Sequence, residues 1–103
     1  MVVGTLRIEF FLHENQSLKG KRKIVKSMVD RVKNRFNVSI AEVGSNDLWQ
    51  KIELGVSAVG NDRRHIDSSL GNVLEYLESL YLAEIVDTQT EIFNVCETEG
   101  KGR

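Results

Sequence analysis

The residues best suited to do chemistry form a basic segment between Lys19 and Arg35. Eight cations lie in this segment, and Asp30 is its one acidic residue. The cations are Lys19, Lys21, Arg22, Lys23, Lys26, Arg31, Lys33 and Arg35. A local cluster of positive charge is typical of a surface that binds phosphate groups, such as those along a nucleic-acid backbone.

Helical spacing places part of this cluster on one side of a helix. At about 100° per residue, four cations share a flank beside the apolar stripe, whereas Lys21 and Lys23 project elsewhere. These four are Lys19, Arg22, Lys26 and Lys33. Cations in the first turn oppose the helix dipole, and an anion bound at the helix start would relieve that repulsion. The predicted RNA-binding or phosphate-binding residues are Ser17, Lys19, Lys21, Arg22, Lys23 and Lys26.

The alternative is a solvated basic face that pairs with acidic residues elsewhere. From Asp67 to Glu99 every charged residue is acidic, so internal or intermolecular neutralisation is a second explanation of the cluster. These residues are Asp67, Glu75, Glu78, Glu84, Asp87, Glu91, Glu97 and Glu99.

Signals for catalysis are weak in this sequence. His13 and His65 are the two histidines, and neither has the spacing of a metal site. Cys96 has no nearby basic residue in sequence to activate its thiol. No nucleotide-binding glycine motif is present, so we expect no metal and no cofactor. A small phosphate-directed enzyme using the loop after the first strand is the least favoured function, because no general base or nucleophile is convincingly placed.

Apolar periodicity predicts the elements that must position these residues. Alternating apolar and polar residues, or short apolar runs, predict four strands, and a period near 3.6 predicts two helices. The strands cover about residues 2–12, 38–43, 49–59 and 84–95, and the first helix covers about 18–36. The second helix has its apolar stripe at Ile66, Leu70, Val73, Leu77 and Leu80. Ser17 is the expected cap of the first helix, and Asn61 or Asp62 that of the second.

This order of elements predicts the fold class. The order β, α, β, β, α, β is that of a ferredoxin-like α+β sandwich, with a four-stranded antiparallel sheet and two helices on one face. Right-handed crossovers place the first and third strands at the centre and leave the other face open. In the last strand the apolar residues do not share one face, because Ile85 and Phe93 are at odd positions whereas Val86 and Ile92 are at even ones. This break in the alternation predicts a bulge or an edge position.

The open sheet face is the second candidate surface. Only Phe11 and Trp49 could stack bases there, and Glu9 and Glu53 would repel phosphate at its centre. This mixture is more typical of a protein contact, so we predict Phe11 and Trp49 as interface residues of a homodimeric interaction module.

Composition bounds the remaining possibilities. The chain has 103 residues, 41% of them hydrophobic, which predicts a single domain over 1–103 with a frayed tail at about 97–103. One cysteine excludes an internal disulfide and is typical of a reducing compartment. No apolar run reaches the roughly 18 residues of a membrane span. We therefore expect a cytoplasmic protein with no membrane partner.

Several segments resemble one known family. They are SLKGKR at 17–22, FNVSIAEVG at 36–44, and Asp47, Leu48, Trp49 and Gln50. Together they are similar to the small bacterial YlxP-like family over about residues 4–92. The resemblance implies a ferredoxin-like fold and assigns no catalytic residue. Its members are often encoded beside translation initiation and ribosome maturation factors, which implies a role near the ribosome or ribosomal RNA. The sequence therefore predicts an uncharacterised, non-enzymatic accessory protein that binds RNA or associates with the ribosome.

Overall fold

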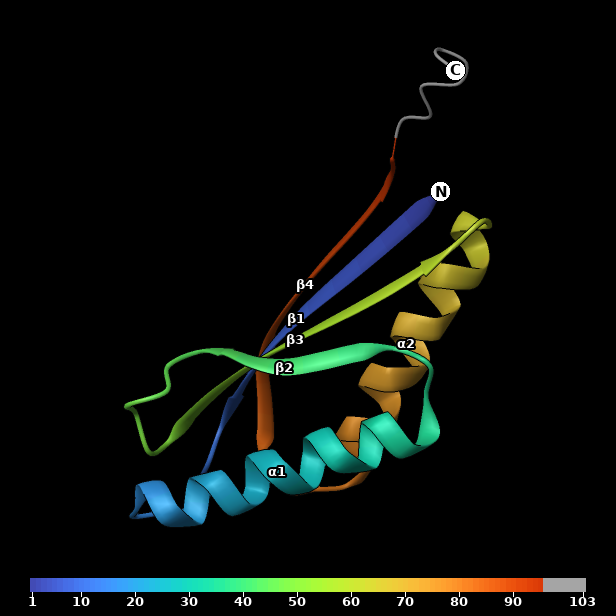
Figure 1. Cartoon of the computed structure of the whole chain (residues 1–103). Coiled ribbons are helices and arrows are strands. Elements are labelled where there is room, and N and C mark those ends of the chain that lie inside the picture. Colours follow the sequence, from blue (N-terminus) through green and yellow to red (C-terminus); the bar gives the residue numbers. More distant parts are fainter. Residues whose placement is uncertain (96–103) are drawn as a thin grey trace.

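A computed structural model describes residues 1–95 and contains the predicted order of elements (Figure 1). The elements are β1 (Val2–Phe11), α1 (Leu18–Arg35), β2 (Ser39–Gly44), β3 (Lys51–Gly60), α2 (Arg63–Ser79) and β4 (Glu84–Asn94). The prediction of a ferredoxin-like α+β fold is confirmed. Cys96 and the predicted frayed tail at 97–103 lie outside the described residues.

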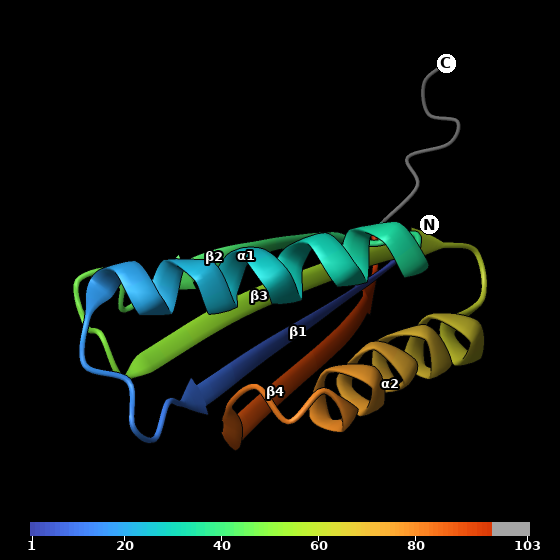
Figure 2. The same cartoon turned by 90° about the horizontal axis from the view of Figure 1, so that it is seen from below.

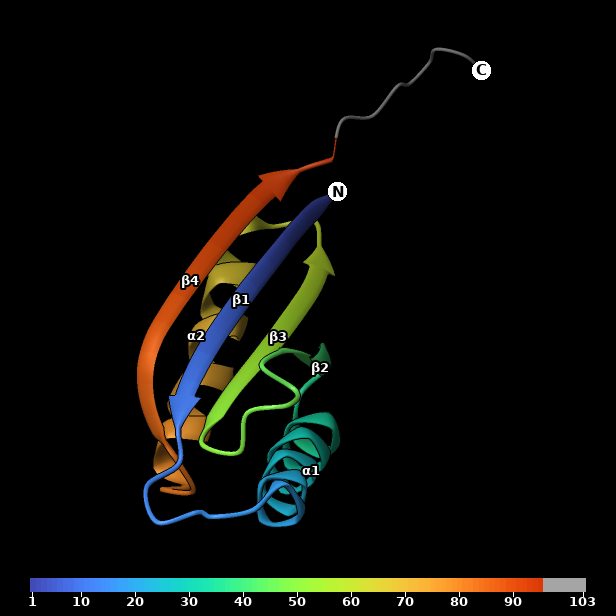
Figure 3. The same ribbon diagram turned by 90° about the vertical axis from the view of Figure 1, so that its left-hand side faces the viewer.

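The sheet is antiparallel throughout, with the strand order β2, β3, β1, β4. The first and third strands are therefore central, as predicted. Figure 3 shows the four strands side by side, with α2 behind them. In the register, Leu6 of β1 lies opposite Val56 of β3 and Thr90 of β4. This register places the even-numbered residues of β1 and β3 on the helix side and leaves the odd-numbered ones on the open face.

The core fills the space between the sheet and the two helices. Both helices lie on one side of the sheet, α1 against β2 and α2 mainly against β1 and β3 (Figure 2). The central strands contribute Leu6, Ile8, Phe10, Ile52, Leu54 and Val56, while α2 contributes Ile66, Leu70, Val73 and Leu77. Burial of these side chains provides the main favourable free energy of folding.

Both helices begin at a capping side chain. The Ser17 hydroxyl accepts a hydrogen bond from the Gly20 amide, and Asp62 accepts one from the Arg64 amide. These contacts satisfy backbone donors that have no partner inside a helix. Ser17 is thus the predicted cap, and of the two candidates for α2 the structure selects Asp62.

No helix within residues 1–95 is long and apolar enough to cross a membrane.

The mixed parity of β4 arises from a bulge in an edge strand. Glu9 pairs with Asp87, whereas Phe10 pairs with Ile85, so Val86 has no partner of its own. The extra residue moves Ile85 and Ile92 to the same, helix-facing side of the sheet. The strand therefore has both of the predicted features, the bulge and the edge position.

Two glycines provide a test of this packing. A Cβ at Gly4 would collide with Cγ2 of Ile66 and would lie 2.8 Å from Cδ1 of Leu70, whereas Gly71 has no neighbour within 4 Å. We expect Gly4→Ala to lower the free energy of unfolding by about 1–3 kcal/mol, because the core has no room for the methyl group. Gly71→Ala should raise it by about 0.5–1 kcal/mol, because alanine favours the helix. Urea denaturation measures both, and an equal effect of the two changes would contradict the close packing of α2 on β1.

Candidate nucleic-acid interface

The outward side of α1 carries five exposed cations, here called the α1 basic face. They are Lys19, Arg22, Lys23, Lys26 and Lys33. The helix packs on the core through the opposite side, where Met28 and Val32 are buried. Lys23 lies only about 40° around the helix from Lys19, so it stands on this outward face rather than apart from it.

Few protein groups neutralise the α1 basic face. Lys26 contacts Asp30 at 2.8 Å, and this hydrogen bond and charge raise the pKa of Lys26. Within residues 1–95, no ion pair joins this face to the acidic residues between Asp67 and Glu91. Neutralisation by the acidic residues from Asp67 to Glu91 therefore has no contact in the described part of the chain, and apart from Lys26 the face is left open to an external anion.

The start of α1 adds to this positive surface. The first turn has no acidic side chain, so nothing there balances the positive end of the helix dipole. Lys19, Arg22 and Lys23 follow directly after the cap. The Ser17 hydroxyl accepts from the Gly20 amide at 3.0 Å, which leaves its own hydrogen free to donate. Ser17 can therefore cap the helix and contact a phosphate oxygen at the same time.

Lys21 does not belong to this surface. Its side chain is only 2% exposed, and its ammonium donates to the carbonyl oxygens of Ser45 at 2.5 Å and Leu48 at 2.7 Å. A carboxylate oxygen of Glu42 lies 3.1 Å away. The assignment of Lys21 as a phosphate-binding residue is wrong, because its charge is buried and already bound within the protein.

The helical pattern contained a signal for this burial. Lys21 precedes the buried or partly buried residues Ile24, Val25, Met28 and Val32 by three, four, seven and eleven positions. These are the spacings of one helix face, so Lys21 extends the apolar stripe by one turn. No pattern in the sequence indicated which groups pair with Lys21, because these groups come from β2 and the loop that follows it.

The loop between β2 and β3 is held against the start of α1 (Figures 1 and 2). Lys21 holds its first part, and the carboxamide of Asn15 holds its end by donating to the Trp49 carbonyl at 2.5 Å. The same carboxamide donates to the Ser17 carbonyl at 2.9 Å. The SLKGKR segment, the end of β2 and the segment around Trp49, which are far apart in the sequence, therefore meet at one end of the molecule.

Phe11 and Trp49, the predicted interface residues, line the same groove at that end of the open sheet face. Trp49 is 48% exposed, and Leu48 and Val86 add further exposed apolar surface to the groove. Leu48 and Val86 were not predicted to lie on this surface, because only the loop and the bulge bring them there. The structure thus joins the two aromatic residues into one apolar patch beside the start of α1.

A network of ion pairs crosses the middle of the open face. The guanidinium of Arg7 donates to Glu53, and the ammonium of Lys51 lies 3.5 Å from a carboxylate oxygen of Glu9. Hydrogen bonds from the Ser45 hydroxyl and from Arg7 lower the pKa of Glu53. The carboxylates that were expected to repel phosphate are therefore paired with cations inside the sheet face.

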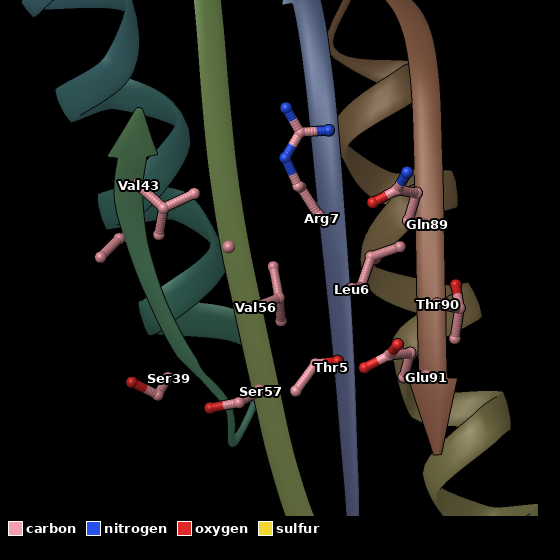
Figure 4. A pocket seen from close by; sticks show the side chains of 12 residues that line it. Thr5, Leu6, Arg7, Ser39, Val43, Val56, Ser57, Gln89, Thr90 and Glu91 are labelled. Carbon is pink, nitrogen blue, oxygen red and sulfur yellow. The ribbon is translucent and has the colours of Figure 1, made fainter. Parts of the chain in front are cut away.

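Beside this network, the open face is hollowed (Figure 4). Thr5 lies there between Ser57 and Glu91, which it pairs with on either side. Gly55 forms part of the floor, since a Cβ at this position would lie 2.8 Å from Cγ1 of Val43. The lining offers hydroxyl, amide and charged groups but no histidine or cysteine. It is a surface hollow of mixed character, because Leu6, Ala41, Val43 and Val56 line it beside these polar groups.

The histidine nearest to this end has a structural contact. His13 Nε2 lies 2.6 Å from Glu84 Oε1, and its ring packs edge-on against Phe11 with centroids 4.7 Å apart. No group of three histidine, cysteine, aspartate or glutamate side chains lies close enough to hold a metal ion in the described range 1–95.

Comparison with known proteins identifies relatives of this chain. A family model described as "Protein of unknown function (DUF503)" matches residues 3–90. The uncharacterized protein YlxP of Bacillus subtilis is 37% identical over 92 residues, which cover 89% of this chain and all of YlxP. A solved structure of a mutant of SnoaB, a cofactor-independent oxygenase from Streptomyces nogalater, covers 96% of this chain and 98% of its own. Its TM-score is 0.48 at 11% identity, which is too low to carry an argument about function.

Lys21 should be essential for stability although it bears a charge. We expect Lys21→Ala to lower the free energy of unfolding by about 3 kcal/mol, since it removes two hydrogen bonds to carbonyls and leaves Glu42 without its cation. Lys23→Ala, which removes an exposed ammonium two residues away, should change it by less than about 0.5 kcal/mol. Chemical denaturation of both variants measures the difference, and equal stabilities would contradict the burial of Lys21.

The lowered pKa of Glu53 makes a contribution to stability that depends on pH. The folded state favours the charged carboxylate, so this contribution is complete above the pKa of Glu53 in the unfolded chain and is lost as pH falls through the lower folded pKa. Glu53→Gln should therefore be less stable than the parent near pH 7, with a smaller difference at about pH 3. Thermal unfolding across this range measures it, and a difference that stays constant with pH would reject the ionic role of Glu53.

Proposed function

Because the chain belongs to the DUF503 family of proteins of unknown function, we propose a function from its own geometry. It is a non-enzymatic, cytoplasmic accessory factor that binds RNA, or the ribosome through its RNA. Phosphate groups dock on the α1 basic face and on the cap of that helix. The genes that accompany members of the YlxP-like family support ribosomal RNA as the partner.

The observation that carries the proposal is the exposure of five cations on one side of a single helix. They follow one another along the helix axis, and only Lys26 among them has an acidic partner within residues 1–95. A line of cations of this kind can contact successive phosphates of one strand, and each contact releases counterions. Burial of Lys21 leaves the line intact, because that residue points to the opposite side.

The docking surface is centred on the first turns of α1. Lys19, Arg22 and Lys23 supply charge there, and Lys26 extends the surface by one turn. The Ser17 hydroxyl and the free amides of the first turn supply hydrogen bonds to phosphate oxygens. Contacts of this kind recognise the backbone rather than the bases, so they predict affinity with little dependence on sequence.

A salt series compares two variants that lose the same charge. One carries Lys19→Ala and Arg22→Ala in the α1 basic face, and the other carries Arg63→Ala and Arg64→Ala at the start of α2, beside Asp62 and Asp67. Binding to ribosomal subunits and to structured RNA should weaken steeply with salt. In the first variant the slope of log K against log salt should fall by about 0.7–0.9 for each phosphate that is no longer neutralised, whereas the second should keep the parent's slope.

Three results would reject the proposal. They are absence of binding by the parent protein, binding that does not depend on salt, and equal losses of affinity in the two variants. Circular dichroism confirms that each variant is folded before the affinities are compared.

A second candidate function, a homodimeric interaction module, is supported by the opposite end of the open face. There Val3 pairs with Val59 on one side and with Phe93 on the other, which forms an apolar row across three strands. Val59 is 66% exposed and Phe93 is 45% exposed. Together with the Trp49 groove, this row provides the apolar surface that a sheet-to-sheet contact needs.

Sedimentation over a range of protein concentrations tests the dimer. If the open face joins two copies, the parent should sediment as a dimer, and Phe93→Lys should shift it to the monomer because the lysine ammonium would be buried at the contact. A parent that remains a monomer at all concentrations would exclude this function without affecting the RNA proposal.

A further inference from the structure

We propose that the Trp49 groove holds one unpaired base of a single-stranded RNA segment whose phosphates lie on the α1 basic face. This inference rests on the proposed function and deepens it, because it names the form of RNA that the protein prefers. It also gives Trp49 a role in binding RNA in place of the protein contact predicted from the sequence.

The groove has the surface that a base needs. Trp49 is 48% exposed, and Phe11, Leu48 and Val86 line the groove beside it. Aromatic side chains stack on the flat face of any base, which contributes about 1–3 kcal/mol per base. Gln50 also lines the groove and can both donate and accept hydrogen bonds at the edge of a base.

The acidic residues of the groove do not oppose this use. Glu84 lies 2.6 Å from His13 Nε2, and Glu9 lies 3.5 Å from the ammonium of Lys51. Glu9 is thus paired with the ammonium of Lys51, and the Glu84 carboxylate is held beside the His13 ring.

The position of Trp49 relative to α1 links the two surfaces. One carboxamide, that of Asn15, donates to both the Trp49 carbonyl and the carbonyl of the helix cap Ser17. Lys21 fixes the preceding residue, Leu48, from the other side through its carbonyl. The groove and the first turn of α1 are thus held at the same end of the molecule, on opposite sides of the sheet, and an RNA strand leaving the groove passes around this end to reach the cations of α1.

This geometry favours a single strand over a duplex. In a duplex the bases are stacked on each other and paired, so none is free to enter a groove of this kind. Single-stranded segments provide both a free base and a flexible backbone that can follow the charged helix.

Trp49 is the one tryptophan of the chain, so its fluorescence reports directly on the groove. Oligoadenylate should quench this fluorescence in parallel with binding, whereas the same strand annealed to its complement should bind more weakly and quench little. Trp49→Leu should weaken binding of oligoadenylate by between about 5-fold and 150-fold, with the salt slope unchanged. Trp49→Phe should recover most of the affinity, since its ring can still stack.

Phe93→Leu is the matched control, because Phe93 is exposed to a similar degree at the far end of the same sheet face. It should bind oligoadenylate as the parent does. Circular dichroism and thermal unfolding establish that the three variants are folded.

Failure of this inference can be told apart from failure of the proposed function. Binding to oligoadenylate that depends on salt but is unaffected by Trp49→Leu would overturn the stacking inference and leave the proposed function standing. If neither oligoadenylate nor ribosomal RNA binds, both are wrong. If Trp49 fluorescence changes with protein concentration alone and Trp49→Leu converts a dimer to a monomer, a second copy of the chain covers the groove, and the inference is likewise overturned.

Discussion

The buried ammonium of Lys21 is the interaction on which the candidate interface depends. An ammonium is rarely buried, because the loss of water must be offset by partners inside the protein. Here two loop carbonyls and the carboxylate of Glu42 supply them. The loop between β2 and β3 must therefore follow a path that presents its carbonyls to α1, and this path brings Trp49 to the start of the helix.

The two sides of the molecule differ in how their charges are used. On the open face of the sheet, ion pairs join Arg7 and Lys51 to Glu9 and Glu53, so these charges neutralise one another within the face. On α1, most of the exposed cations have no acidic partner within residues 1–95. A chain with a formal net charge of −1 can therefore present a strongly positive surface, because its charges are segregated rather than balanced locally.

Much of the fold could be predicted because the periodicity of apolar residues reports which face of an element is buried. β1 and β3 alternate cleanly, and Ser17 and Asp62 have the side chains that cap helices. The uncertain parity of β4 was itself informative, since it marked the bulge at Val86. The candidate site could be predicted less fully. Charge alone identified the basic segment, but it did not separate Lys21 from the cations around it.

The sequence by itself determined the order of elements, the faces they bury and the presence of a basic helix, because each follows from the spacing of residues within one element. Only the tertiary structure decided what pairs with the buried Lys21 and that Trp49 lies beside the start of α1. These outcomes depend on contacts between residues 21 to 34 positions apart, such as Lys21 with Glu42 and Asn15 with Trp49. Such contacts form when the helix packs on the sheet, so the sequence around one partner does not predict the other.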